Sequence, residues 1–161
     1  MRYLMQQKMI CFGNDFVIKD ENECNVYIVD GKAFSFGNQL SFQDTNKREL
    51  ARISQKLLAF KPTYRIISGG ATIAAVRKAL FSFRNRFLID IPGPDDITVV
   101  GSFIEHEYSF YRNKQEIASV SRKYFRLTDT YGIEIKSNVD DLLVLCSAVV
   151  IDLCCHTPKK P

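Results

Sequence analysis

The sequence predicts a mainly β protein in which an antiparallel closed barrel of about 12 strands surrounds a central hydrophobic C-terminal α-helix. Three observations predict this fold: segments of alternating apolar and polar residues, an internal repeat, and a long apolar run near the C-terminus. Of the 161 residues, 46% are hydrophobic and 25% charged, which is the composition of an ordinary globular protein. We expect a single domain over residues 1–161, with strands over about 8–136 and the helix over about 140–155.

The strands are expected where the hydrophobic pattern has a period of two or forms a short apolar run. Turn-forming residues such as Gly-Gly at 69–70 and PGPDD at 92–96 separate these segments. Strands of this length at such short spacing favour an antiparallel barrel or sandwich. The expected strands lie near 8–12, 15–20, 25–30, 33–43, 48–58, 63–68, 72–82, 86–91, 96–103, 106–112, 115–125 and 130–136.

The repeat predicts two similar half-sheets. Residues 46–66 resemble residues 113–133, so that Asn46-Lys47 recurs as Asn113-Lys114 and Thr63-Tyr64 as Thr130-Tyr131. Upstream, Ser41-Phe42 matches Ser109-Phe110 with a shift of one residue. The period is too long for a solenoid, and two half-sheets that close into one barrel would have no exposed edges.

The C-terminal run is expected to be a helix enclosed by the protein's own barrel. A stretch from Leu142 to Cys155 would be about 21 Å long as a helix, whereas a bilayer core is about 30 Å thick. Asp152 opposes membrane insertion further. Asn138 or Asp140 can cap the helix, and Pro158 would stop it.

Within this run only Ser147 is polar between Leu142 and Ile151, so no face of the helix suits water. A barrel of about 12 strands has a lumen that its wall side chains alone do not fill, and this helix would fill it. A helix that binds a partner or anchors the tail in a membrane is the alternative. If the helix is enclosed, Asp152 needs a partner or a place at the barrel mouth, and we expect a salt bridge to an Arg or Lys of the wall.

Several segments carry a resemblance to a known family. The segments YRIISGGATIAAVRKAL and LARISQKLLAFKPTYRI, and the order YGIEI, Asp140, apolar helix, resemble the LURP-one-related family with its bacterial YxjI-like members. The resemblance spans about Tyr3 to Asp152 and implies the tubby C-terminal fold, which is also proposed for phospholipid scramblases. It implies no catalytic residues.

The basic residues are concentrated in one part of the chain. Between Lys47 and Arg86 there are ten basic residues and one acidic residue, Glu49. Such asymmetry indicates either an anion-binding face or a solvated barrel exterior. On one strand Arg52, Ser54 and Lys56 alternate with Ala51, Ile53 and Leu57, which places both charges outside. The candidate anion-binding residues are Arg52, Lys56, Arg65, Arg77 and Lys78.

The remaining features give little support to an enzyme. The sequence has no phosphate-binding loop, dinucleotide-binding fingerprint or nucleophile elbow, so no catalytic residue and no cofactor is expected. It holds two histidines and five cysteines without zinc-ligand spacing, so no metal site is expected either. Glu105, His106 and Glu107 point to alternate faces of a strand, and His106 is expected at the surface.

These observations favour a non-enzymatic cytoplasmic monomer without a signal peptide or transmembrane segment. Because tubby-type domains bind phosphoinositides, the resemblance adds weight to binding of an anionic phospholipid headgroup or an acidic partner, rather than nucleic acid. The alternatives are a scramblase-like membrane-associated protein and a protein-interaction module in stress or defence signalling. Against the scramblase, the chain lacks a Pro-rich N-terminal region and a cluster of palmitoylatable cysteines.

Overall fold

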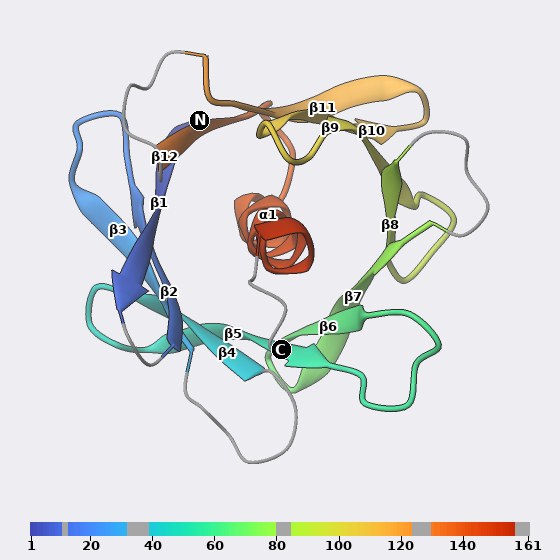
Figure 1. The fold of residues 1–161 in the computed structure, drawn as a ribbon, viewed down its shortest axis with the longest axis horizontal. Helices are drawn as coiled ribbons and strands as arrows, with labels where there is room; N and C mark the ends of the chain where they lie inside the picture. The colour runs from blue at the N-terminus through green and yellow to red at the C-terminus, as the bar shows by residue number, and fades with distance from the viewer. Residues whose placement is uncertain (11–12, 32–38, 80–84, 124–129, 157–161) are drawn as a thin grey trace.

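The computed structural model describes the chain except for residues 11–12, 32–38, 80–84, 124–129 and 157–161. It has twelve strands and one helix in the described residues, and the strands form a closed barrel around the helix (Figure 1). The strands are β1 (Arg2–Ile10), β2 (Gly13–Lys19), β3 (Asn25–Asp30), β4 (Gln39–Asp44), β5 (Glu49–Gln55), β6 (Thr63–Ser68), β7 (Ala71–Lys78), β8 (Arg86–Asp90), β9 (Ile97–Ser102), β10 (Glu107–Arg112), β11 (Gln115–Ser121) and β12 (Thr130–Ile135). The helix is α1 (Asp141–His156). The predicted fold class is confirmed.

The barrel wall is a single antiparallel sheet in which each strand pairs with its neighbours in sequence. The first and last strands close it, with Met5 opposite Tyr131 in the β1–β12 pair. Closure leaves none of the twelve described strands with a free edge for another chain to pair with. Along each strand, alternate residues face inward, as Ala74 and Val76 do in β7, where both are buried.

The repeat appears in the structure as two corresponding hairpins six strands apart. The β4–β5 pair has a register shift after Phe42, and the β10–β11 pair has one after Phe110. The turns correspond at one residue, because Lys47 and Lys114 both have positive φ angles, of 63° and 64°, whereas Asn113 has a positive φ that its echo Asn46 lacks. Residues that echo each other in sequence therefore occupy equivalent places in the two halves of the barrel.

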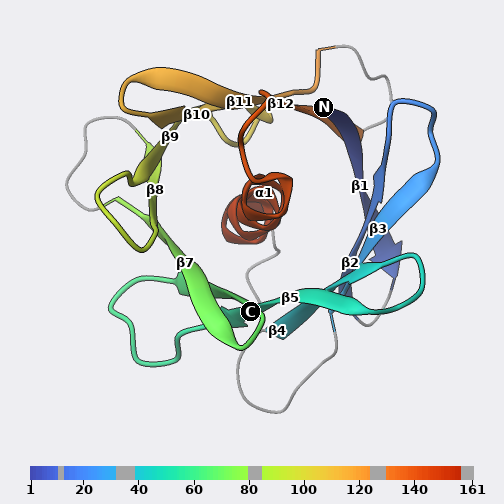
Figure 2. The same ribbon diagram turned by 180° about the vertical axis from the view of Figure 1, so that it is seen from behind.

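Helix α1 runs through the middle of the barrel, as the views from both sides show (Figures 1 and 2). Every residue from Leu143 to Leu153 is buried. Asp140 caps the helix: its Oδ1 accepts a hydrogen bond of 3.0 Å from the backbone N–H of Leu142. The polar Ser147 is satisfied inside the core, where its hydroxyl donates to the Leu143 carbonyl at 2.7 Å.

The strand boundaries differ from expectation mainly at two places. The first strand begins at Arg2 rather than near residue 8. The prediction missed its start because the sequence there does not alternate clearly between apolar and polar residues. The fifth strand ends at Gln55 rather than at residue 58, so Leu57 is not an inward-facing wall residue. Parts of the expected strands 8–12, 33–43, 72–82 and 115–125 lie outside the described residues, as do Arg84 and the predicted helix stop Pro158.

Candidate functional site

Four of the five candidate anion-binding residues lie on the outside of the wall formed by β5, β6 and β7. The backbone N–H of Lys56 donates to the carbonyl of Thr63 at 2.7 Å, and Thr63 is paired with Arg77 across β6 and β7. Arg65 lies two residues further along β6, opposite Ser54. Arg52, Lys56, Arg65 and Arg77 therefore occupy one outer surface, which we call the basic face.

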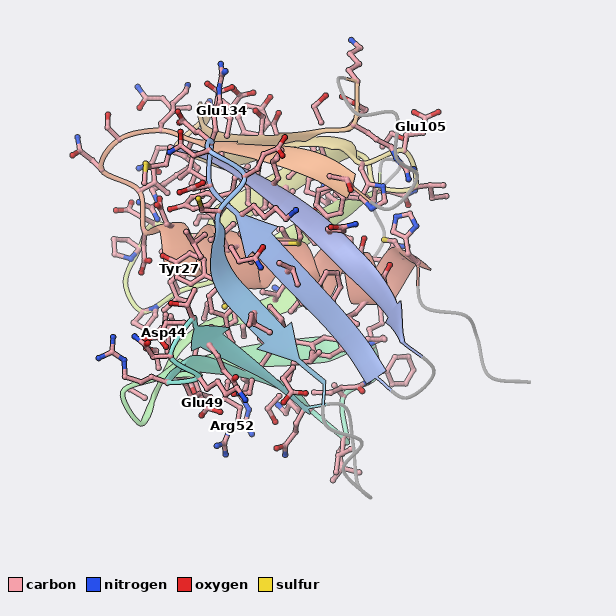
Figure 3. The ribbon with its side chains drawn as sticks, turned by 90° about the vertical axis from the view of Figure 1, so that its left-hand side faces the viewer. Tyr27, Asp44, Glu49, Arg52, Glu105 and Glu134 are labelled. Atoms are coloured by element: carbon pink, nitrogen blue, oxygen red, sulfur yellow. The ribbon has the colours of Figure 1, made fainter. Side chains whose placement is uncertain are left out.

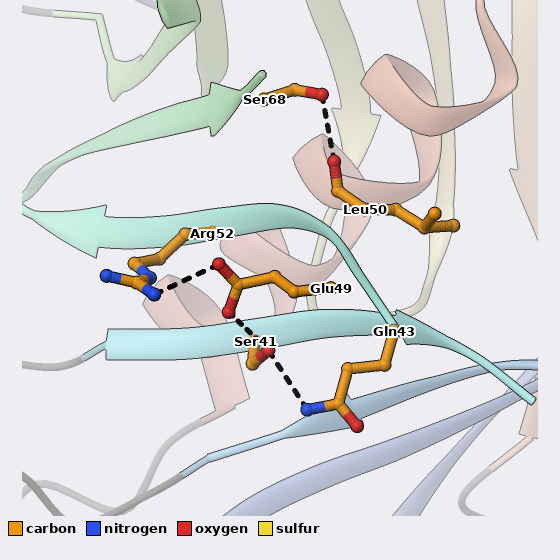
Figure 4. Close-up of polar contacts among 6 residues, drawn as sticks. All are labelled: Ser41, Gln43, Glu49, Leu50, Arg52 and Ser68. Atoms are coloured by element: carbon orange, nitrogen blue, oxygen red, sulfur yellow. Dashed lines mark hydrogen bonds and ion pairs between the residues drawn. The ribbon is translucent and has the colours of Figure 1, made fainter. Parts of the chain in front are cut away.

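Two of these cations are paired with carboxylates of their own wall. Arg52 forms an ion pair of 3.0 Å with Glu49, and the other oxygen of Glu49 accepts a hydrogen bond of 2.6 Å from Ser41 (Figure 4). Arg52 and Glu49 both point outward from the barrel (Figure 3). Arg77 is paired with Asp90, also at 3.0 Å. A paired guanidinium attracts an external anion less strongly because its charge is already compensated.

Lys56 and Arg65 are exposed, and within the described part of the chain neither of them has an ion pair. They are the two members of the basic face with uncompensated charge.

The fifth candidate, Lys78, does not belong to this surface. It is the last residue of β7 and, by the alternation of the strand, lies on the same side as Ala74 and Val76 and not on the outer side with Arg77. Burial raises the pKa of the Cys155 thiol, and the charge of Lys78 opposes that shift, which places this lysine near the C-terminal end of α1. Four of the proposed residues are thus brought together and one is separate.

An exposed apolar loop lies beside the basic face. The connection between β5 and β6 carries Leu57, Leu58 and Phe60, whose exposed fractions are 65%, 97% and 103%. We call these three side chains the apolar loop. The connection that carries them projects from the wall (Figure 1), and Lys56 and Lys61 flank the three side chains in the sequence KLLAFK. Isolated exposed leucines are common in proteins, but three large apolar side chains within four residues form a patch that indicates a binding surface.

A second group of polar side chains lies at the end of the barrel where α1 finishes. His106 is in the turn between β9 and β10 with a positive φ of 53°, and the adjacent Glu105 marks this end in Figure 3. His106 as a whole is only 7% exposed. Its Nε2 lies 2.7 Å from Oδ1 of Asp152, and the ring stacks on that of His156 with a centroid distance of 4.2 Å. We call His106, Asp152 and His156 the mouth cluster.

The mouth cluster corrects two expectations. His106 is buried rather than at the surface, because the left-handed turn conformation carries its ring inward onto Tyr131, 4.4 Å away between centroids. Asp152 is paired with this histidine and not with an Arg or Lys of the wall. Glu105 and Glu107 do not join the group, since Glu105 is exposed and Glu107 accepts hydrogen bonds from β11 and the residues after it.

Comparison with known proteins agrees with the resemblance found in the sequence. Residues 1–152 match the model of a family described as LURP-one-related. The chain is 30% identical over 149 residues to the uncharacterized protein YxjI of Bacillus subtilis, covering 92% of this chain and 90% of that protein. A protein of Arabidopsis thaliana with a known X-ray structure superposes with a TM-score of 0.69 at 17% identity, covering 94% of this chain and 90% of that one. Among the described residues, no helix has the length and apolarity needed to cross a bilayer.

Proposed function

The chain belongs to the LURP-one-related family, and we propose that it is a non-enzymatic binding protein that docks on anionic phospholipid surfaces. The observation that carries this proposal is the apolar loop beside the basic face. A membrane interface has an apolar interior under a layer of negatively charged headgroups, and it accepts apolar and basic side chains together. The loop offers both within six residues, Lys56 to Lys61.

The energetic contributions fit a reversible peripheral interaction. Full burial of a Leu or Phe side chain is worth about 1.5–3 kcal/mol, and shallow insertion of Leu58 and Phe60 would supply part of this. Each basic side chain near the headgroups adds about 1 kcal/mol, which falls as the salt concentration rises. Lys56 and Arg65 supply this attraction more effectively than Arg52 and Arg77, whose charges Glu49 and Asp90 compensate.

The first prediction concerns the charged part of this surface. We expect Lys56→Glu/Arg65→Glu to abolish co-sedimentation with vesicles that contain phosphoinositides, while the thermal melt stays nearly unchanged because both side chains are exposed. The matched control is Lys114→Glu/Lys136→Glu, which lowers the net charge by the same amount at exposed positions elsewhere on the barrel. Equal binding by both double variants would show that only net charge matters and would contradict the proposed surface.

The apolar loop is tested separately. Leu58→Ser/Phe60→Ser should leave a salt-sensitive attraction to anionic vesicles. It should remove the binding that survives high salt, because the free energy gained by inserting apolar side chains into the membrane is lost. Binding of the wild-type protein is also measured with neutral phosphatidylcholine vesicles and with free inorganic phosphate for comparison. If the wild-type protein binds free phosphate as well as it binds vesicles, the ligand is a soluble anion and the membrane proposal fails.

A further inference from the structure

The mouth cluster combines three side chains that commonly bind metal ions. One potential ligand atom from each of His106, Asp152 and His156 can be chosen so that all three lie within 4.8 Å of one another. Asp152 and His156 are four positions apart on α1, which puts them on the same face of the helix. His106 approaches that face from the β9–β10 turn, 46 positions earlier in the sequence.

The hydrogen bonds of the two imidazoles show which nitrogen of each ring an ion could bind. Nε2 of His156 lies 2.9 Å from the carbonyl oxygen of Phe103, and since a carbonyl only accepts, this nitrogen carries the proton. Nε2 of His106 donates in the same way to the Asp152 carboxylate. In neutral His156, Nδ1 then holds the lone pair. In His106 it is Nε2 that faces the carboxylate, so an ion that binds both side chains takes the place of the Nε2 proton, and the ring changes to the tautomer with its proton on Nδ1.

Several buried polar atoms around the cluster have no partner among the described residues. They include Nδ1 of His106, Oδ2 of Asp152 and the hydroxyl of Tyr108. The side chains are nearly inaccessible, since Asp152 is 2% exposed and Tyr108 4%. Buried polar atoms normally have a hydrogen-bond or ligand partner, because leaving one without a partner costs free energy. A cation bound between Nε2 of His106 and the Asp152 carboxylate would give the second carboxylate oxygen a partner.

We propose that His106, Asp152 and His156 bind one first-row divalent metal ion, of which Zn²⁺ is the model. Two imidazoles and one carboxylate are a ligand set that such ions take, whereas Mg²⁺ and Ca²⁺ prefer oxygen ligands alone. Ligand atoms around zinc lie about 2.0–2.2 Å from the ion. The cluster is wider than this requires, so binding draws the three side chains together.

Binding also requires the two stacked rings to separate. The imidazoles of His106 and His156 are within 10° of parallel, and a metal ion must lie in the plane of each ring that binds it. One ring must therefore turn. His156 is the ring that can do so, because it is half-buried at the last residue of α1 whereas His106 is packed between His156 and Tyr131.

The direct test uses the unmodified 161-residue chain. It contains only two histidines, so nuclear magnetic resonance of the imidazole C–H groups reports on His106 and His156 without interference from others. Addition of Zn²⁺ should shift both sets of signals with saturation at one ion per chain, while Mg²⁺ should shift neither. If both sets stay unchanged at millimolar Zn²⁺, the cluster is a hydrogen-bonded stack only and the proposal is overturned.

Variants then test the ligands individually. His156→Ala changes a half-buried residue at the helix end, and we expect it to lower Zn²⁺ affinity in calorimetry by more than about 100-fold, since loss of even an outer hydrogen-bond partner costs 10–100-fold. The control Cys154→Ser removes a neighbouring exposed thiol and should leave the affinity unchanged. Unchanged affinity in His156→Ala, or loss of binding in Cys154→Ser with His156 intact, would overturn this ligand assignment.

Discussion

Val149→Asp is expected to leave the protein insoluble or without a cooperative thermal transition. Val149 has no exposed surface and lies in the middle of α1, which the barrel wall surrounds on all sides. A carboxylate there would be buried without a partner, at a cost on the order of 3–5 kcal/mol or more. Because a domain of this size is stable by only about 5–15 kcal/mol, one such group removes much of its stability. Circular dichroism melts and binding of a hydrophobic dye measure the outcome.

The matched control makes the same change on the other side of the wall. Val100→Asp replaces a half-buried valine of β9 that faces outward, next to the fully buried Val99. We expect its melt to stay close to that of the wild type, since substitutions near the surface usually change stability by less than about 1 kcal/mol. If Val149→Asp melted as cooperatively as Val100→Asp and at a similar temperature, the helix would not be enclosed.

The barrel and its helix were predictable because their signals are local and periodic. Most wall strands alternate apolar and polar residues, and the run from Leu143 to Leu153 has no polar face, so enclosure suited it better than a partner-binding or membrane-anchoring helix. The repeat also carried structural information, since the bulges after Phe42 and Phe110 fall at echoed positions.

The β5–β6 connection differs from the prediction for a physical reason. The alternation of Ala51, Ile53 and Leu57 with Arg52 and Lys56 fits a strand that continues to residue 58, and apolar residues are normally assigned to the core. The chain instead leaves the sheet after Gln55 and exposes Leu57 and its neighbours. Hydrophobicity alone does not distinguish a core residue from one that a partner surface will cover.

The mouth cluster was missed because no local pattern encodes it. His106 and Asp152 are 46 positions apart, and the contact depends on the positive φ of a turn residue that is not glycine. One signal was present: Asp152 and His156 are spaced four apart on a helix predicted to be enclosed, in a chain with only two histidines. A buried carboxylate in that position needed a partner, and the other histidine was available to provide it.

Gly101→Ala should destabilise the protein by at least about 3 kcal/mol, combining backbone strain with overpacking. Gly101 has a φ of 146°, a conformation that side chains other than hydrogen rarely allow. A Cβ added there would lie 2.4 Å from the carbonyl oxygen of Glu107 and 2.5 Å from Cα of Tyr108. Both atoms belong to the backbone of the paired strand β10, so no side chain can move aside to make room.

The clash would also act on the mouth cluster. Gly101 is paired with Tyr108, and the turn between their strands carries Phe103 and His106. Forcing β9 and β10 apart would displace this turn from α1. The His106–Asp152 hydrogen bond should then be lost together with stability, and nuclear magnetic resonance should show a shift of the His106 imidazole signals.

Gly70→Ala is the control: its φ of 78° is also positive, but an added Cβ meets nothing within 4 Å. It should lower the free energy of unfolding by only about 1–2 kcal/mol, the cost of a left-handed conformation for a residue with a side chain. If chemical denaturation gave the same loss of unfolding free energy for both variants, the φ angle, and not contact with β10, would be what requires glycine at position 101.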